Sequence, residues 1–535
     1  MRIALARRPT LVALAVCLAL AGLSFLLEPF ALLPDPWAWV VWGRELAAFD
    51  LDTTSGPSWK PLPPLVIAVL SVAGGAAPVL WALVARAGGL LAFVMAWRVA
   101  RRLAGPPAGW IAAAVLAVAL LPSWMNIVAM GREEGLLCAL ILWAVDCHLR
   151  RRGGRAFALA FAASLLRPEA WPFLGLYGLW LLWRSPKLRP LVLGLFLALL
   201  PLWFIPDVVT VGDPLQSSQK AQGGISGTTL TEPVKRAVEL VPAPLLLVAL
   251  AAAALAALRV RRMGVKDAMR MAGGGGRVGS DAGADRGAGA DRGAGANRDA
   301  GANRSAQDAH EGERELVVVA LLIGAVGWVA LVAVTSKVAN YAGIARFQHP
   351  AAAVVAVLAG VGAVWLAAAV RDALTRRRPS LPGPAAAALV GVALLVATGP
   401  FLPTRARRID RVLVEEDARA GLDASLGDAV DAAGGRRKVV ACGTAYTTPG
   451  NEPALAWRLE RHIDDVLSDR PEVPGAVVRV DAQALRETNV RRLGIRLYPV
   501  RDRTFDPVAE AGVWEVLAAC RPGVTLGGSA GRAAR

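Results

Sequence analysis

The fold is decided by residues 98–152, which read RVARRLAGPPAGWIAAAVLAVALLPSWMNIVAMGREEGLLCALILWAVDCHLRRR. Two apolar runs, 107–127 and 133–149, stand between arginine clusters, and the polar segment GREEG separates them. Runs of this length and composition cross a bilayer as helices, and arginines gather on the cytoplasmic side of membrane proteins. The stretch therefore predicts a hairpin of two membrane crossings, with GREEG on the side away from the cytoplasm.

The same alternation continues in both directions along the chain. Further apolar runs lie at 10–33, 78–97, 156–166, 170–183, 189–206, 238–258, 315–335, 349–370 and 383–403. Basic clusters occupy every second connection, which predicts about eleven crossings with the N-terminus in the cytoplasm. The chain has 535 residues, is 55% hydrophobic and carries a net charge of +17. Because the basic residues lie between membrane runs, the charge indicates membrane topology and excludes a nucleic-acid partner.

Three stretches need separate interpretation. Pro61–Gly75 is apolar, but another crossing there would break the alternation, so we predict a re-entrant or interfacial helix. The runs around Arg167-Pro168-Glu169 are short and have basic clusters on both flanks, which predicts a hairpin of two short helices. Met1–Phe30 begins like a secretory signal but lacks a small-residue cleavage site, which favours an uncleaved first helix.

Composition divides the chain into four regions. We predict an N-terminal transmembrane region at 1–258, a linker at 259–314, C-terminal transmembrane helices at 315–403 and a soluble domain at 404–535. The linker holds an imperfect repeat of GADRGA and GANRSA type that cannot build a core, so we expect disorder on the cytoplasmic side. A spacer and a docking arm for a partner are both open.

The soluble domain has the pattern of a small α/β fold outside the cytoplasm. We predict helices at 407–434 and Glu452–Leu467 and strands at Lys438–Cys442 and Ala476–Asp481. Cys442 lies at the end of a predicted strand and Cys520 at the end of a predicted helix, in a compartment that permits disulfides. Both a bridge and two unpaired thiols are consistent with the sequence.

Polar residues gather in the connections that face outward. The first such loop carries Asp35 and Lys60, GREEG carries Arg132, Glu133 and Glu134, RPEAWPF carries Arg167 and Glu169, and NYAGIARFQHP carries Tyr341, Arg346 and His349. A further outward segment reads VGDPLQSSQKAQ. Ionisable residues at membrane depth are costly and mark functional sites. We therefore expect these carboxylates and cations to converge on one face.

These segments resemble the GT-C superfamily of membrane glycosyltransferases, which use polyprenyl-phosphate sugars. Asp35 in PDPWAW resembles the acidic residue of the first loop in that family, and WKPLPPLVIA resembles the Lys-Pro-Pro-Leu stretch of the lipid A aminoarabinose transferases. GREEG resembles the second acidic site of the family, and GDPL and ARFQHP resemble loops of its mannosyl- and arabinosyltransferase-like members. The resemblance covers residues 1–403.

The resemblance implies an all-α polytopic membrane protein with a small extracytoplasmic α/β domain. It also implies an inverting hexosyl- or pentosyltransferase that moves a sugar from a polyprenyl-phosphate donor to a glycan, lipid or protein acceptor outside the cell membrane. Asp35 would act as general base or would bind a divalent cation, Mg or Mn, with Glu133 and Glu134 also catalytic. The predicted substrate and phosphate contacts are Lys60, Arg132, Arg167, Glu169, Tyr341 and Arg346.

Simpler explanations exist for several of these residues. Glu133 and Glu134 begin a helix, where the dipole favours carboxylates in any protein. Lys60 and Arg346 could reach the bilayer interface, as long cationic side chains do, and Arg167 with Glu169 could form a structural ion pair. His349 fits an interfacial position, and the many tryptophans fit an aromatic belt. A transporter or flippase, or a scaffold for envelope assembly, is accordingly the alternative function.

Overall fold

The computed structural model describes residues 9–27, 29–222, 229–263, 292–377, 383–487 and 504–527. Within them, every predicted crossing contains a helix: α2 (Pro9–Ser24), α5 (Ala77–Ala104), α6 (Pro106–Val128), α7 (Glu134–Leu149), α8 (Gly153–Ser164), α9 (Trp171–Arg184), α10 (Arg189–Val211), α13 (Ala243–Met263), α15 (Arg292–Val338), α16 (His349–Arg377) and α17 (Gly383–Thr398). By length and composition, seven helical stretches of the described chain could cross a membrane. The predicted multi-span helical fold is confirmed.

Helix α16 forms the centre of the bundle. Residues 351–363 are all buried, as expected for a helix that is apolar on every side. A Cβ atom at Gly360 would collide with the backbone of α6 at Ala108, and one at Gly362 would collide with α13 at Val248. Small residues that let helix backbones approach closely are how helices associate in lipid, where the hydrophobic effect between them is weak.

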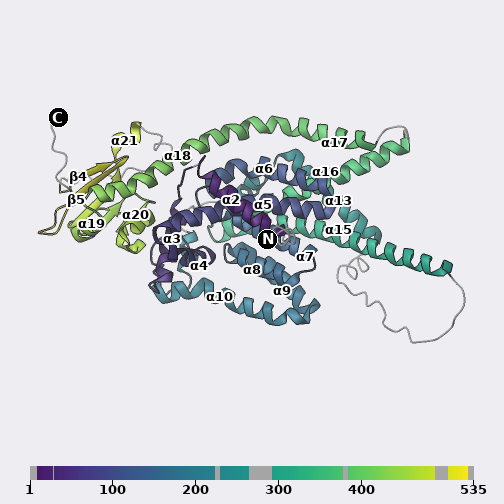
Figure 1. The fold of residues 1–535 in the computed structure, drawn as a ribbon, viewed down its shortest axis with the longest axis horizontal. Coiled ribbons are helices and arrows are strands. Elements are labelled where there is room, and N and C mark those ends of the chain that lie inside the picture. Colours follow the sequence, from purple (N-terminus) through teal and green to yellow (C-terminus); the bar gives the residue numbers. More distant parts are fainter. Residues whose placement is uncertain are drawn as a thin grey trace.

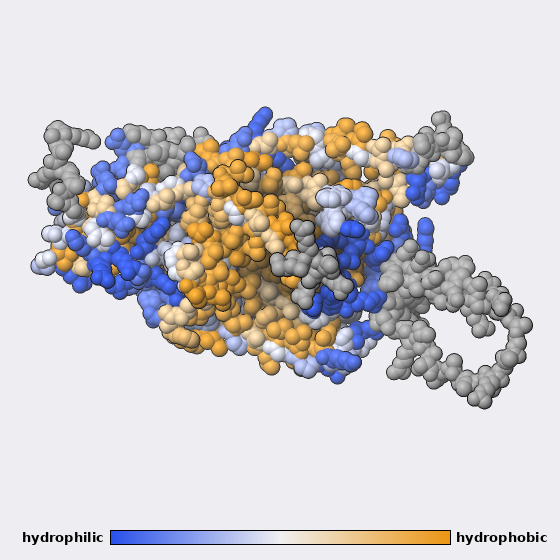
Figure 2. Space-filling view, in the orientation of Figure 1, coloured by the Kyte–Doolittle hydropathy of each residue, from blue (hydrophilic) through white to orange (hydrophobic). Residues whose placement is uncertain are grey.

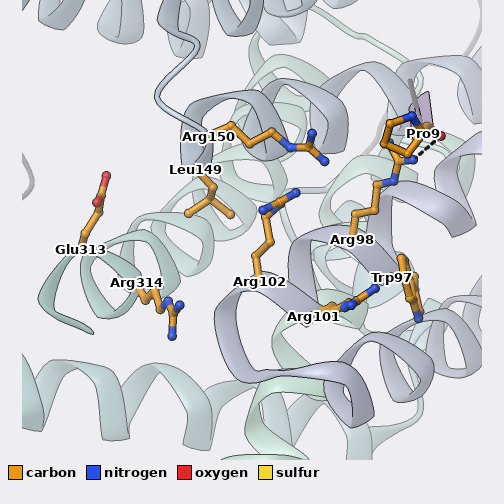
Figure 3. Close-up of a pocket in the computed structure, with 9 residues that line it drawn as sticks. All are labelled: Pro9, Trp97, Arg98, Arg101, Arg102, Leu149, Arg150, Glu313 and Arg314. Atoms are coloured by element: carbon orange, nitrogen blue, oxygen red, sulfur yellow. Dashed lines mark hydrogen bonds between the residues drawn. The ribbon is translucent and has the colours of Figure 1, made fainter. Parts of the chain in front are cut away.

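The bundle has two polar ends separated by an apolar belt, shown in orange in Figure 2. The C-terminal domain rests on one end, which we call the domain end (Figure 1). At the other, the arginine end, Arg98, Arg101 and Arg102 finish α5, and Arg150 follows α7 (Figure 3). Such an asymmetric distribution of arginines is typical of a protein that spans a membrane.

The first connection at the domain end contains more helix than we predicted. Helix α2 ends at Ser24, so the predicted first crossing at 10–33 is too long, and α3 (Pro34–Ala47) follows it. Proline at the first positions of α3 suits a helix start, because the missing N–H would have no partner there. Next comes α4 (Leu62–Leu70), where we predicted a helix that does not cross; its nine residues rise about 14 Å, too short for a bilayer.

The predicted hairpin around Arg167 is present. Helices α8 and α9 are 12 and 14 residues long, and a 3₁₀ turn, Pro168–Ala170, joins them. The pyrrolidine ring of Pro168 fixes the residue before it in an extended conformation, which ends the preceding turn. The side chains of this turn therefore stay at the domain end.

The predicted disordered linker, 259–314, is helical at both of its ends. Helix α13 continues to Met263 and α15 begins at Arg292, so the prediction was wrong for these flanks. Alanine, arginine and glutamate are strong helix formers, and extending an existing helix needs no new nucleus. Residues 264–291 lie outside the described residues.

The C-terminal domain is a five-stranded mixed sheet with helices. Its elements are α18 (Leu402–Ala432), α19 (Arg436–Cys442), β1 (Thr444–Thr447), α20 (Glu452–Leu459), β2 (Val466–Leu467), β3 (Gly475–Val480), α21 (Ala482–Glu487), β4 (Asp506–Ala511) and β5 (Trp514–Ala519). The strand order is β2-β1-β3-β5-β4. β1 runs parallel to β2 and β3, with Thr444 opposite Gly475, while β5 is antiparallel to β3 and β4. Helix α18 runs from the end of α17 to this sheet (Figure 1).

Three local predictions in this domain need correction. Residues 438–442 belong to helix α19 rather than to a strand, and the strand follows at Thr444–Thr447. The predicted helix Glu452–Leu467 ends at Leu459, because Glu460 takes a left-handed conformation and the chain then enters β2. Cys520 follows strand β5, not a helix. Short apolar runs fit a helix or a strand equally well by periodicity, which explains these errors.

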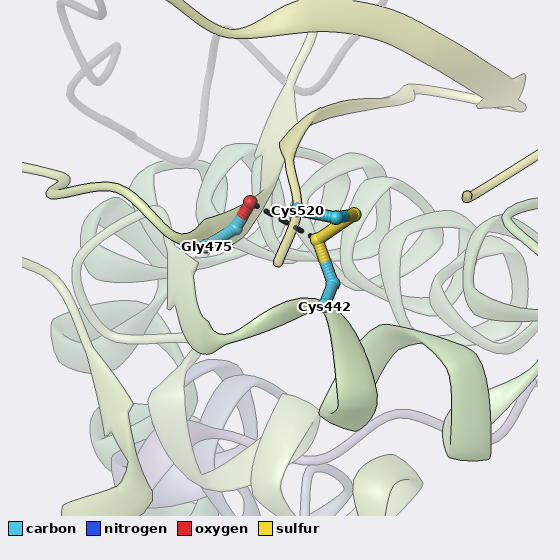
Figure 4. Close-up of a disulfide and its surroundings, with 3 residues drawn as sticks. All are labelled: Cys442, Gly475 and Cys520. Atoms are coloured by element: carbon cyan, nitrogen blue, oxygen red, sulfur yellow. Dashed lines mark hydrogen bonds between the residues drawn. A yellow bond between two sulfur atoms is a disulfide. The ribbon is translucent and has the colours of Figure 1, made fainter. Parts of the chain in front are cut away.

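Cys442 and Cys520 form a disulfide, which decides between the two alternatives left open by the sequence (Figure 4). The bridge joins the end of α19 to the residue after β5, across 78 residues of chain. The backbone N–H of Arg521 also donates to the carbonyl oxygen of Cys442. The bridge thus ties one end of the sheet to the helix that precedes it.

Replacing Cys442 and Cys520 together by alanine should destabilise the C-terminal domain. Closing a loop of this length stabilises a fold by about 4 kcal/mol in the chain-entropy description. We expect a lower thermal unfolding midpoint in detergent, measured by tryptophan fluorescence, with Cys138→Ala as the control for a thiol outside the domain. Equal midpoints for the double variant and the wild type would contradict this role of the bridge.

Enlarging Gly360 should loosen the helix bundle. Leucine at this position cannot fit against Ala108 unless α16 and α6 move apart, and overpacking of this kind costs about 1–3 kcal/mol. A Cβ atom at Gly391, on α17, would meet no described atom within 4 Å, so Gly391→Leu is the matched control. The thermal midpoint in detergent should fall for Gly360→Leu alone; a comparable fall for both would overturn the packing argument.

Candidate functional site

The predicted polar residues form one connected network at the domain end of the bundle. Its four cations are Lys60, Arg132, Arg167 and Arg346, and its four carboxylates are Asp35, Glu133, Glu134 and Glu169. They come from four connections of the chain. The structure therefore brings together residues that lie as far as three hundred positions apart, and Tyr341 joins them through a hydrogen bond.

Arg167 is the hub of the network. It lies within 3.0 Å of Glu134, 3.4 Å of Glu133 and 3.6 Å of Glu169, and its side chain is only 2% exposed. It also donates a hydrogen bond of 3.2 Å to the hydroxyl of Tyr341. The guanidinium stacks 3.9 Å above the ring of Phe347, which a planar, weakly hydrated cation does better than an ammonium group.

Asp35 lies at the exposed rim of the network. Arg132 donates a hydrogen bond of 2.6 Å to it, and Arg346 lies 3.9 Å away. The side chains of Asp35 and Arg346 are 22% and 21% exposed, whereas Glu133 and Glu134 are fully buried. Burial alone would raise the pKa of Asp35, but Arg132, Lys60 and Arg346 outweigh it and lower that pKa. Asp35 is thus an ionised carboxylate within reach of solvent.

Lys60 connects the first loop to the acidic start of α7. Its ammonium group is paired with Glu133 and lies 5.0 Å from the centre of the Trp39 ring. Proline residues on both sides of Leu62 begin α4 directly after it, so the lysine is held at a helix start. The remaining exposure of its side chain is 12%, which places it between the rim and the buried base.

A second polar cluster holds this loop in place; it joins the predicted segment VGDPLQSSQKAQ to Asp207 and Thr53, which we did not predict. Asp207 of α10 accepts a hydrogen bond from Thr53 and one from the backbone N–H of Ser217, at the start of α11 (Gln216–Gln222). The Ser217 hydroxyl then accepts from the N–H of Trp59, next to Lys60. The sequence does contain a signal for this cluster, because Asp207 is a carboxylate in an otherwise apolar run, where such residues mark functional or structural sites. The structure shows that Asp207 is fully buried.

The C-terminal domain and α3 share one hydrophobic core. Trp37, Trp39 and Trp42 are buried in one hydrophobic cluster that also contains residues of α18, α20 and the sheet. Asp423 of α18 accepts hydrogen bonds from the backbone N–H of Leu32 and from the indole N–H of Trp37. These tryptophans are core residues of a domain contact, and the aromatic belt suggested by the sequence does not describe them. The helix that carries Asp35 is therefore positioned by the soluble domain.

Several polar atoms of the network have unused bonding capacity. Among the described residues, one oxygen of Glu133 and one of Glu134 have no hydrogen-bond partner. The Nε atoms of Arg132 and Arg346 also lack one within that part of the chain. Buried polar atoms usually find partners, so such a concentration points to a site that receives a polar ligand.

Two predicted neighbours lie outside the network. His349 is not interfacial as we expected, because it is fully buried, accepts or donates a 2.9 Å hydrogen bond with Ser123 and stacks on Trp124. Asp213 of the GDPL segment caps its own turn by accepting from the N–H of Leu215. That segment acts through Ser217, as described above.

The carboxylates do not converge as ligands of one divalent cation would. In the part of the chain that the structure describes, no three His, Cys, Asp or Glu side chains are grouped to hold a metal ion. Asp35 is instead paired with Arg132. Dependence on Mg or Mn stays a prediction.

The chain has an ArnT-like fold, in which a bundle of apolar helices carries a small C-terminal mixed sheet. The chain is similar to the crystal structure of ArnT from Cupriavidus metallidurans bound to undecaprenyl phosphate, with a TM-score of 0.51 and 15% identity over 96% of this chain and 98% of that one. The apo structure of the same protein matches with a TM-score of 0.50 over the same shares. At this identity the likeness establishes the fold alone. No family model and no curated protein sequence matches the chain.

Glu45 offers a pH test of the contact between α3 and the domain. It is 3% exposed, and burial raises its pKa from an ordinary 4.5 to about 7, although it lies 3.0 Å from His462. The folded protein therefore retains this proton where the unfolded chain releases it. The resulting stabilisation is complete below about pH 4.5 and is lost as the pH rises through about 7.

We expect the thermal midpoint of the wild type to fall relative to Glu45→Gln between pH 5 and pH 8, roughly the range over which this carboxyl ionises. Tryptophan fluorescence in detergent measures both proteins. Because His462 lies 3.0 Å from Glu45, the comparison is repeated in a His462→Gln background. Parallel pH profiles in that background would show that Glu45 does not titrate near neutral pH.

Proposed function

We propose that the protein is a membrane glycosyltransferase that moves a sugar from a polyprenyl-phosphate donor to an acceptor outside the cytoplasm. The observation that carries the proposal is the network of four cations and four carboxylates at the domain end, with Asp35 ionised and accessible at its rim. The ArnT-like fold and the undecaprenyl phosphate bound to ArnT support the class of donor.

The balance of charges suggests how an anionic donor would bind. Every cation of the network already faces a carboxylate, so an arriving phosphate must take one of those cations over. Arg346 is the best placed, because its contacts of 3.7 Å with Glu134 and 3.9 Å with Asp35 are longer than ordinary charged hydrogen bonds. Lys60, which is less exposed than Arg346, would hold a second phosphate oxygen.

Asp35 would serve as the general base. In the proposed step, its carboxylate takes the proton of the acceptor hydroxyl while that oxygen attacks the anomeric carbon of the sugar. The bond from this carbon to the phosphate oxygen breaks, and the electron pair leaves with the lipid phosphate. Lys60 and Arg346 stabilise the charge on the departing phosphate. One displacement inverts the configuration at the anomeric carbon.

An apolar groove provides a place for the lipid tail. It holds about 350 Å³ between α7, α8, α9, α15 and α16, and it includes Ala170 and Pro350 beside the network and His148 near the arginine end. Trp328, in its wall, donates to the carbonyl oxygen of Phe347, the residue on which Arg167 stacks. The groove thus begins at the network and extends along the membrane-spanning helices.

The arginine clusters orient the protein in this proposal. They lie at the end opposite the C-terminal domain, and by the positive-inside rule that end faces the cytoplasm. The network and the domain then face outward. The sugar, the acceptor and any requirement for a divalent cation are for the assay to determine.

The test is turnover of radiolabelled polyprenyl-phosphate mannose and arabinose by the purified full-length protein. Asp35→Asn should lower the rate about 10²–10⁴-fold, as expected for loss of a general base. Lys60→Ala should lower it about 10²-fold by removing charge stabilisation in the transition state. Asp469→Asn and Lys235→Ala, exposed residues outside the network, are the matched controls. A parallel arm with a chelator tests the predicted metal.

Two results would overturn the proposal. Activity retained by Asp35→Asn would remove the proposed base. Absence of turnover with either donor, together with normal growth of cells that carry only the Asp35→Asn and Lys60→Ala variants, would favour a transporter or a scaffold, because neither needs this base.

A further inference from the structure

A polar cavity lies at the arginine end, far from the network. It holds about 640 Å³, and its walls come from the start of α2, the end of α5, the end of α7 and α15. Figure 3 shows the side chains that line it: Pro9, Trp97, Arg98, Arg101, Arg102, Leu149, Arg150, Glu313 and Arg314. Five arginines and one glutamate make it strongly cationic.

The carboxylates nearby neutralise only part of this charge. Asp146, which is 1% exposed, lies 2.6 Å from Arg102 and 3.0 Å from Arg150 and holds both in place. Glu313 is engaged by Arg151, outside the cavity lining, and points away from the other arginines in Figure 3. The acidic side chains therefore fix the geometry of the site and leave a cationic surplus.

The surplus consists of three guanidinium groups. Arg98 is 9% exposed and donates to neutral oxygens, the hydroxyl of Thr10 and the carbonyl of Pro9. Arg101 lies 4.9 Å from the centre of the Trp97 ring. Among the residues whose side chains the structure describes, which leave out those of 292–311, no carboxylate lies within ion-pair distance of Arg98, Arg101 or Arg314. A cavity lined by such groups attracts an anion.

Aromatic rings place this cavity at the level of the lipid headgroups. Trp97 packs edge-on against Trp110, with 5.6 Å between ring centres, and Trp110 is 68% exposed. Tryptophans with an exposed face concentrate at the membrane–water interface. One wall of the cavity thus borders lipid, while Arg101 and Arg314 are exposed at its edge.

We propose that this cavity binds the phosphate group of an anionic phospholipid. Guanidinium groups pair with phosphate oxygens through two parallel hydrogen bonds, and basic pockets between membrane helices hold the headgroups of such lipids. A soluble phosphate presents the same chemistry, but the tryptophan wall favours a ligand that enters from the bilayer. The site is separate from the proposed catalytic network, so its test does not depend on turnover.

The experiment uses the full-length protein reconstituted in nanodiscs of phosphatidylcholine with a minor fraction of phosphatidylglycerol. Native mass spectrometry, after the protein has been released from the nanodiscs, counts the phosphatidylglycerol molecules that remain bound to it. The variant Arg101→Gln/Arg314→Gln removes two exposed cations of the cavity and leaves the Asp146 pairs intact. Arg261→Gln/Arg262→Gln removes two exposed cations at the end of α13, outside the cavity lining, and is the matched control.

We expect the wild type and the control to retain phosphatidylglycerol in preference to phosphatidylcholine. The cavity variant should lose this preference about tenfold, which corresponds to about 1.4 kcal/mol. An equal loss of the preference for phosphatidylglycerol in the cavity variant and the control would show that the lipid responds to overall charge, and it would overturn the proposed binding site. Displacement of the lipid by millimolar inorganic phosphate would assign the cavity to a soluble phosphate and overturn the lipid proposal.

Discussion

Eight charges are held at one end of a bundle whose flanks form an apolar belt. The structure of the domain end depends on the mutual neutralisation of these charges. A lone charge at this depth would be expensive, and a buried pair repays its desolvation only with good geometry and further hydrogen bonds. Arg167 meets these conditions by contacting three carboxylates, a tyrosine and an aromatic ring. Removing it would leave carboxylates buried without a partner. The helices that meet at this residue are consequently fixed relative to one another.

The network is graded from a rigid base to an accessible rim. Glu133, Glu134 and Arg167 have almost no exposure, while Asp35 and Arg346 have about a fifth of their surface open. Rigid, paired charges at the base keep the site preorganised, since they need not rearrange when a ligand binds. Groups at the rim can exchange partners. The same gradient separates the paired residues of the base, which hold the helices in place, from the residues of the rim, which are open to a ligand.

Much of this site could be predicted from the sequence, because charged residues at the ends of apolar runs must lie near a membrane surface. Because arginine clusters occupy every second connection, the remaining connections, which carry Asp35, Lys60, GREEG and Arg167, are predicted to lie at the same end of the helix bundle. The pairings themselves could not be predicted, since they depend on how α7, α8 and α16 are rotated and packed. The same limit applies to Asp423, whose partners lie in a distant part of the chain. Errors at 438–442 and at His349 arose where a short run or a single residue gave no periodic signal.

The shared core of α3 and the C-terminal domain has a consequence for synthesis of the protein. Leu32 and its partner Asp423 are 391 positions apart, so the ribosome makes the first outer loop long before the residues that cover its tryptophans. Domains of a growing chain form in the order in which they emerge. The loop that carries Asp35 must therefore wait at the membrane surface with its apolar side uncovered. The mouth of the site is completed only after α18, which carries Asp423, has been made.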